Sequence, residues 1–196
     1  MIAALPYAQL AKAAYSSAPT IGAEDSAARA VVATMPDGTA VAFPGTNNIA
    51  CWLADLDAEV TDIVGLGGVH SGFWRAFQSI SPDLMQRAPQ TTVGHSEGAA
   101  LAIIYAAALC LAGKPPRAVY GFEPPRVSVD GTIGALLAEH GVKVYLYRNG
   151  EDLVPLVPRL LHVWQHPAEL IAIGTPSEPL PNVTDHMIDN VIAALG

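Results

Sequence analysis

The sequence is poor in cysteine and in basic residues. Cys51 and Cys110 are its only cysteines, and they show neither the density of a disulfide framework nor the spacing of a metal site, so we expect two free thiols. Lys and Arg together number 10, against 18 Asp and Glu, and the net charge is −8. No run of basic residues exists that would neutralise phosphates, so nucleic acid is not an expected partner.

Long apolar stretches are also missing. The longest run, residues 99–113, is shorter than the roughly 20 residues that a membrane-spanning helix needs, and its many alanines predict a core helix. The first basic residue, Lys12, comes only after Pro6 and Gln9, so the start lacks the basic residues and the apolar stretch of a secretion signal. We therefore expect a cytoplasmic protein by default.

What the chain does have is enough apolar material for a large core. About half of it, 51%, is hydrophobic and only 14% is charged, which excludes a disordered protein. A length of 196 residues suits one domain, and no repeat or linker suggests a boundary, so residues 1–196 are predicted to form a single domain.

The order of the predicted elements indicates an α/β fold. Strands are expected at residues 30–35, 39–43, 118–122 and 142–147 and in a short segment ending near 93, and helices at 6–15, 72–87 with a break at Pro82, 99–113, 133–140 and 184–195. The first two strands flank Pro36-Asp37-Gly38, the composition of a hairpin turn. Residues 161–173 are expected to form another hairpin. Strands that alternate with helices predict a mostly parallel central sheet flanked by helices.

The strongest local motif lies at residues 94–98, which read Gly-His-Ser-Glu-Gly. This G-x-S-x-G motif follows an apolar strand and opens the alanine-rich helix, the context in which the serine is held on a sharp turn with its hydroxyl exposed. Ser96 is therefore the predicted nucleophile of a serine hydrolase. The alternative is an ordinary glycine-rich turn in which Ser96 only caps the helix.

A serine hydroxyl needs an imidazole base and a carboxylate that orients it. In α/β-hydrolases the base follows the nucleophile and the acid in the chain. His70 and His95 are thereby excluded. The remaining histidines are His140, His162, His166 and His186. His140 is expected to cap a helix end, His162 and His166 lie in the predicted hairpin, and His186 lies at the start of the last helix, where this fold needs its base.

Asp152 is the predicted acid, because it follows a strand at the edge where open α/β sheets place their sites. Asp130 is expected to cap a helix. Asp185 and Asp189 are too close in sequence to His186 to approach its ring from the required side. Glu151 remains a weaker competitor for the role of acid.

Several further segments resemble the class 3 lipases, the fungal-lipase-like branch of the α/β-hydrolases, over most of the chain from Phe43 onward. Residues 43–46 (FPGT) are similar to the family's F-R-G-[ST] loop, 52–56 (WLADL) to W-[LI]-x-D-L, and 69–73 (VHSGF) to V-H-x-G-F. Residues 122–127 (FEPPRV) are similar to F-G-x-P-R-V, with Glu123 in place of the glycine, and 152–155 (DLVP) match the D-x-V-P around the family's acid.

The resemblance implies the same triad of Ser96, Asp152 and His186. It also implies an oxyanion hole formed by the backbone amide of Glu97 and by Thr46, whose hydroxyl is a second donor. This chemistry needs neither a metal nor a cofactor. Two residues near the predicted site depart from the family pattern: Pro44 replaces the usual Arg, and Glu97 replaces the usual Leu, which brings a carboxylate near the developing oxyanion.

Residues 47–56 occupy the position of the lid helix in the resembling lipases. One apolar stripe contains Ile49, Trp52, Leu53 and Leu56, and Asn47 is placed to cap the helix. A small lid favours short to medium acyl esters and transient contact with a lipid interface. The alternative is a fixed surface helix.

The predicted function is thus hydrolysis of a small-molecule or lipid carboxylic ester through an acyl-enzyme. Two alternatives stay open: acyl transfer by the same triad, and a protein that keeps the fold for binding after losing catalysis.

Overall fold

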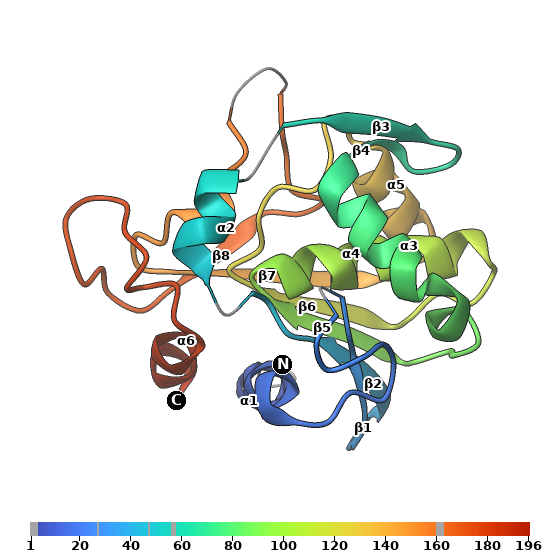
Figure 1. The fold of residues 1–196 in the computed structure, drawn as a ribbon, viewed down its shortest axis with the longest axis horizontal. Helices are drawn as coiled ribbons and strands as arrows, with labels where there is room; N and C mark the ends of the chain where they lie inside the picture. The colour runs from blue at the N-terminus through green and yellow to red at the C-terminus, as the bar shows by residue number, and fades with distance from the viewer. Residues whose placement is uncertain (1–3, 27, 47, 56–57, 160–162) are drawn as a thin grey trace.

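A computed structural model describes residues 4–26, 28–46, 48–55, 58–159 and 163–196 of the chain. Its centre is a six-stranded sheet in the order β1-β2-β5-β6-β7-β8, in which only the β1–β2 pair is antiparallel (Figure 1). The strands are β1 (Val31–Met35), β2 (Gly38–Phe43), β5 (Thr91–His95), β6 (Ala118–Phe122), β7 (Lys143–Asn149) and β8 (Leu170–Ile173). The expected α/β fold with a mostly parallel sheet is confirmed.

Helices cover both faces of this sheet (Figure 1). One face carries α3 (Ser71–Leu84), α4 (Glu97–Leu111) and α5 (Thr132–Glu139), and the other carries α1 (Leu5–Ser16) and α6 (Ile188–Leu195). Successive strand residues point to opposite faces, so Val41 and Phe43 enter the core under α4 while Ala40 and Ala42 pack toward α1. The helix α4 is apolar on every side because the sheet, α3 and α5 enclose it.

The remaining elements lie beyond the carboxyl ends of the strands or beside them. They are α2 (Ile49–Asp55), the antiparallel pair β3 (Val60–Ile63) and β4 (Gly67–His70), and a short 3-10 turn, η1 (Val154–Leu156). Asp130 ties the β3–β4 pair to the start of α5, because its carboxylate accepts from the backbone N–H groups of Gly68 at 2.8 Å and Thr132 at 3.0 Å. Asp130 thus bonds the first N–H of α5, but the residue at the N-cap position is Gly131 and not the expected Asp130.

Three predictions about individual elements are wrong: a helix break, a hairpin and the start of the last helix. The helix α3 is not broken at Pro82 but continues to Leu84. Proline lacks the N–H that would bond the carbonyl of Gln78, and the hydroxyl of Ser81 donates to that carbonyl instead, at 3.1 Å. The hairpin expected at residues 161–173 is also absent from its described part, residues 163–173, whose one strand is β8, parallel to β7.

The last helix begins at Ile188 and not at Thr184. Residues 184–187 form a turn instead, in which the carbonyl of Thr184 accepts from the N–H of Met187 at 3.2 Å. His186 therefore lies on this turn before α6. The described helices include none that is long and apolar enough to cross a bilayer.

Candidate active site

Ser96 lies on the turn between β5 and α4, at the carboxyl end of a central strand. Its backbone is in the left-handed half of conformational space, with φ of 57° and ψ of −131°, which is uncommon for a residue with a side chain. Glycines on either side make the turn feasible. A Cβ atom at Gly94 would collide with the backbone of Gly98, and one at Gly98 would collide with the carbonyl of Phe43. The strand, the turn and the helix that the motif requires are therefore all present.

The hydroxyl of Ser96 is buried, with the residue only 1% exposed. Among the described residues its Oγ has no hydrogen-bond partner, which is unusual for a buried polar atom. A buried hydroxyl that is held on a constrained turn and not used structurally is free to react.

Asp152 and His186 are brought together from two loops far apart in the chain. Nδ1 of His186 lies 2.7 Å from Oδ2 of Asp152, and both side chains are buried. Asp152 follows β7, and His186 precedes α6. Because Nδ1 is bound to the carboxylate, Nε2 is the ring nitrogen left to exchange a proton with a substrate or a hydroxyl.

Hydrogen bonds keep Asp152 ionised in this buried position. Burial alone would raise the pKa of its carboxyl, but the bond with His186, the neighbouring carboxyl of Glu123 and the N–H of Val154, which donates at 3.0 Å, outweigh burial and hold the pKa below its usual value. An ionised carboxylate at Nδ1 fixes the imidazole tautomer and stabilises the imidazolium that forms when Nε2 takes a proton.

The predicted oxyanion residues lie beside Ser96. The N–H of Glu97 is the first of α4 and belongs to the unpaired amides of a helix start. The loop that carries Thr46 is held close, because a Cβ atom added to Gly45 would fall 2.7 Å from Cβ of Ser96. The hydroxyl of Thr46 accepts from the N–H of Asn48 at 3.2 Å, so its own proton is available for an oxyanion.

The side chain of Glu97 lines a cavity of about 360 Å³ together with Arg29, Pro44 and Thr46. Burial raises the pKa of this carboxyl to about 7. The neutral acid therefore predominates below that pH, and the repulsion expected between a carboxylate and an oxyanion is absent there.

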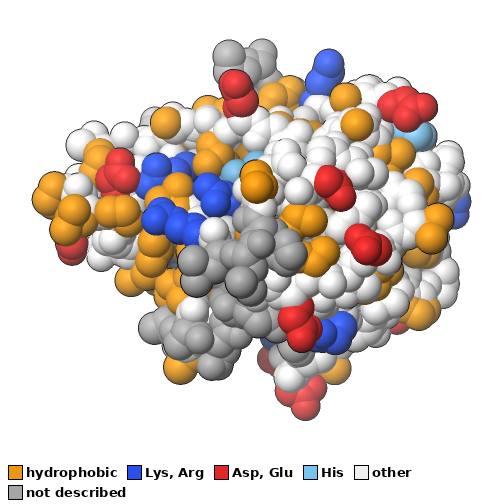
Figure 2. All heavy atoms as spheres, turned by 90° about the horizontal axis from the view of Figure 1, so that it is seen from above, with side chains coloured by type: hydrophobic (Ala, Val, Ile, Leu, Met, Phe, Trp, Pro, Cys, Tyr) orange, Lys and Arg blue, Asp and Glu red, His pale blue; other side chains and the backbone are white. Residues whose placement is uncertain are grey.

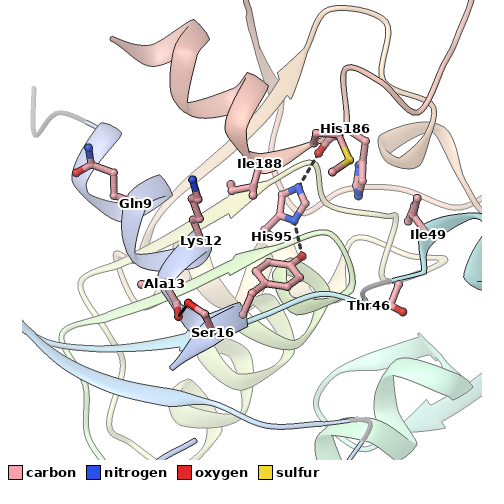
Figure 3. Close-up of a pocket in the computed structure, with 11 residues that line it drawn as sticks. Gln9, Lys12, Ala13, Ser16, Thr46, Ile49, His95, His186 and Ile188 are labelled. Carbon is pink, nitrogen blue, oxygen red and sulfur yellow. Dashed lines mark hydrogen bonds between the residues drawn. The ribbon is translucent and has the colours of Figure 1, made fainter. Parts of the chain in front are cut away.

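His95, which was excluded as the base on chain order, lies next to His186 and contacts its backbone (Figure 3). Its Nε2 lies 2.8 Å from the carbonyl oxygen of His186, and its Nδ1 lies 2.6 Å from the hydroxyl of Tyr15. Tyr15 comes from α1, a helix for which sequence analysis gave no link to the site. Neither contact was foreseeable, because no sequence pattern indicates that the first helix reaches the nucleophile turn.

Glu123 is the other residue whose place was not foreseen. It is fully buried directly after β6, and its φ of 52° is a left-handed value that a glycine adopts more easily. Its carboxyl, that of Asp152 and the ring of His186 each bring one N or O atom to a group whose members all lie within 4.8 Å of one another. The glycine of the resembling motif is thus replaced by a side chain that enters the site.

A cavity of about 520 Å³ opens next to His95 and His186 (Figure 3). Its apolar wall includes Ala13, Ile49 and Ile188. Such a volume is typical of small-molecule sites. Lys12 also lines the cavity and pairs with Asp189, an ion pair that joins α1 to α6.

The predicted lid residues have different surroundings. Residues 49–55 do form a helix, α2, while Asn47 and Leu56 lie outside the described residues. Ile49 lines the cavity, but the ring of Trp52 stacks on Phe73 at a centroid distance of 6.2 Å and packs against the main core. Leu53 is half-buried.

The other candidate residues have structural contacts elsewhere. His140 follows the last residue of α5, Nε2 of His166 donates to the carbonyl of Pro155 at 2.8 Å, and His162 lies outside the described residues. Glu151 pairs with Arg148 at 2.7 Å. His70 accepts from the backbone at the start of α3.

Asp185 holds loops together and does not orient the imidazole. Its carboxylate accepts from the N–H of Glu151 at 2.9 Å and from that of Ser177 at 3.1 Å. The first bond joins the loop after β7, which carries Asp152, to the turn before α6, which carries His186, and the second ties the loop after β8 to the same turn.

Comparison with known proteins gives a family from the sequence and a fold from solved structures. The chain is 24% identical over 157 residues to the secreted mono- and diacylglycerol lipase A of Penicillium cyclopium, which covers 74% of this chain and 51% of that protein. It therefore spans about half the length of the curated relatives it matches.

Solved structures show the fold. A mutant form of MDLA from Penicillium cyclopium superimposes with a TM-score of 0.72 at 20% identity, over 93% of this chain and 82% of that one. A triacylglycerol lipase described as having a serine protease triad at its catalytic centre gives 0.71 at 18% identity, over 93% and 91%. Residues 40–162, more than half of the chain, match the model of the lipase (class 3) family. The chain belongs to the class 3 lipase family.

Proposed function

We propose that this protein hydrolyses carboxylic esters through an acyl-enzyme formed on Ser96. The observation that carries the proposal is the buried 2.7 Å contact between His186 and Asp152, together with a serine hydroxyl that has no hydrogen-bond partner among the described residues, on the turn that this fold uses for its nucleophile. Membership of the class 3 lipase family supports the same activity.

The proposed reaction has two halves. Oγ of Ser96 attacks the ester carbonyl while Nε2 of His186 takes its proton, and Asp152 stabilises the resulting imidazolium. The N–H of Glu97 and the hydroxyl of Thr46 donate to the oxyanion. The imidazolium then protonates the departing alcohol. Water, deprotonated by the same imidazole, cleaves the acyl-serine and regenerates the hydroxyl.

The cavity beside His186 supports esters with short to medium acyl chains. Its volume of about 520 Å³ lies within the range for small ligands, and Ala13, Ile49 and Ile188 supply an apolar wall. An acyl chain that packs against this wall gains affinity with each buried CH₂, about 0.8 kcal/mol, until the wall is covered.

Transient contact with a lipid interface is the second part of the proposal. Met187 lines the cavity and is 54% exposed, so an apolar side chain stands at its edge. The face seen from above in Figure 2 shows hydrophobic side chains among Lys, Arg, Asp and Glu side chains, and the hydrophobic ones support contact with acyl chains. The relative from Penicillium cyclopium is named a mono- and diacylglycerol lipase, a name that refers to lipid esters.

The test is hydrolysis of p-nitrophenyl esters of increasing acyl length by the wild type and by Ser96→Ala. We expect turnover in the wild type that rises from acetate to medium chains and then falls, and none above background in the variant. A fluorophosphonate probe should label the wild type only. A protein that folds but neither turns over any ester nor reacts with the probe would contradict the proposal.

A further inference from the structure

The buried carboxyl of Glu123 lies against the Asp152–His186 pair. Glu123 and Asp152 are both fully buried, and their carboxyl groups belong to the cluster of atoms within 4.8 Å described above. Two ionised carboxylates so close together and shielded from water would repel each other strongly. One of the two must therefore carry a proton or share a cation.

The hydrogen bonds around Glu123 indicate where a proton belongs. Oε1 accepts from the N–H of Asn149 at 2.6 Å, which suits a carbonyl-type oxygen. Oε2 has no hydrogen-bond partner among the described residues, and the carboxyl group of Glu123 interacts with that of Asp152. The two oxygens of Asp152 already accept from His186 and from the N–H of Val154. A proton on Oε2 converts this contact of two acceptors into a hydrogen bond.

The charged groups nearby favour the same state. Burial and the negative charge of Asp152 raise the pKa of Glu123 well above its usual value, whereas Asp152 is held ionised by its donors. Arg148 opposes this rise, but its guanidinium is engaged by Glu151 at 2.7 Å and by the backbone carbonyl of Asp152 at 3.1 Å. His186 faces the pair from the turn before α6.

We propose that Glu123 is a neutral positioning residue, whose protonated carboxyl donates a hydrogen bond to Asp152 and holds it behind His186. The catalytic part rests on the proposed function, and the protonation does not. Glu123 also aligns the base: it accepts from the N–H of Asn149, and the amide of Asn149 donates to the carbonyl of Asp185, next to His186, at 2.9 Å.

A bound cation is the competing way to relieve the repulsion, because two carboxylates and an imidazole are possible ligands. Nδ1 of His186 is already bonded to Asp152, however, and a metal among the three would have to replace that bond. The cation is therefore an outcome that the experiment must separate from the proton.

The first experiment measures the proton directly and needs no activity. Infrared difference spectra of wild type minus Glu123→Gln, taken near pH 7, should contain the carbonyl stretch of a protonated carboxylic acid. Its absence, with Glu123 ionised, would overturn the proposal. If EDTA then lowered the melting temperature of the wild type but not of Glu123→Gln, the cation would be the explanation.

The second experiment follows stability with pH. Below the usual pKa of glutamate both the folded and the unfolded chain are protonated at Glu123, and as the pH rises only the unfolded chain ionises, so the wild type loses stability that Glu123→Gln keeps. The difference between the two melting temperatures, variant minus wild type, should increase by about 3 °C per pH unit above pH 4. A gap that does not change with pH would overturn the proposal. The same substitution at the exposed Glu139 controls for the replacement itself.

The positioning role is tested by a matched pair of variants. The amide of Glu123→Gln still donates to Asp152, whereas Glu123→Met has a similar size and no donor. We expect Met to lower kcat for a p-nitrophenyl ester about tenfold or more relative to Gln, with little change in KM. Equal kcat values in the two folded variants would show that the hydrogen bond positions nothing. Wild type without esterase activity would instead contradict the proposed function and leave the infrared and stability results standing.

Discussion

Nε2 of His95 lies 2.8 Å from the carbonyl oxygen of His186, so the residue before the predicted nucleophile holds the backbone of the predicted base. A carbonyl only accepts, which places the proton of the His95 ring on Nε2. Nδ1 then accepts from the hydroxyl of Tyr15 at 2.6 Å. Burial, followed by the charge of His186, lowers the pKa of His95 to about 3, so this ring is neutral at every pH at which the enzyme would work.

The chain of contacts from Tyr15 to His186 predicts a coupled loss of stability. Tyr15→Phe leaves Nδ1 of His95 without its donor, and His95→Phe removes both bonds, so each variant should lose about 1–3 kcal/mol of unfolding free energy in urea titrations. The double variant should lose less than the sum, because the two residues share one bond. Strictly additive losses would mean that the Tyr15–His95 contact contributes nothing.

The proposed triad predicts effects that do not add. Ser96→Ala, Asp152→Ala and His186→Ala should each lower kcat about 10⁴-fold or more. The kcat of the triple variant should be no lower than that of the least active single variant. Circular dichroism should show that each variant is folded. A His186→Ala variant with near-native turnover would exclude His186 as the base.

Because burial raises the pKa of the Glu97 carboxyl, we expect a loss of activity at alkaline pH. Its carboxyl, with a pKa of about 7, is neutral below that pH and negative above it, and a negative charge near the oxyanion opposes the transition state. Glu97→Leu should stay active, because the backbone N–H is the donor. The ratio of kcat in Glu97→Leu to kcat in the wild type should rise several-fold between about pH 6 and 8. A constant ratio would mean that the side chain points its charge away from the reaction.

The helix α2 predicts different results at two positions. Ile49 lines the cavity, so Ile49→Ser should depress turnover of longer acyl esters more than that of acetate. The ring of Trp52 packs on Phe73, so Trp52→Ser should cost about 1–3 kcal/mol of stability and lower activity equally for all chain lengths. A loss that depends on chain length in Trp52→Ser, without a change in melting temperature, would favour a helix that moves as a lid.

The sequence predicted those parts of the fold that local patterns control. Apolar strands with strong turn residues between them, such as Pro36-Asp37-Gly38, were located within a residue or two. Where local preference and tertiary contacts disagree, prediction failed. Pro82 is a helix breaker by itself, but the hydroxyl of Ser81 replaces the bond that it removes. Residues 163–173 lack the partner strand of a hairpin, because β8 pairs with β7, a strand distant in sequence.

In the candidate site too, the residues placed by local patterns were predicted and those placed by tertiary contacts were not. The turn at Ser96 and the pairing of Asp152 with His186 follow from a motif, from chain order and from the family resemblance, and the geometry agrees. Tyr15 and Glu123 could not be assigned, because their roles depend on which loops meet at the ends of β5, β6 and β7. The signal that was available for Glu123 was its place in a motif where relatives have glycine.

The layer formed by α1 and α6 combines the first and the last described helices of the chain, and the cavity lies between them. During translation Tyr15 is synthesised well before His186. A chain synthesised as far as α4 contains Ser96 but neither Asp152 nor His186. By the proposed mechanism ester cleavage needs all three, so any chain that stops before the turn at residues 184–187 is inert toward esters.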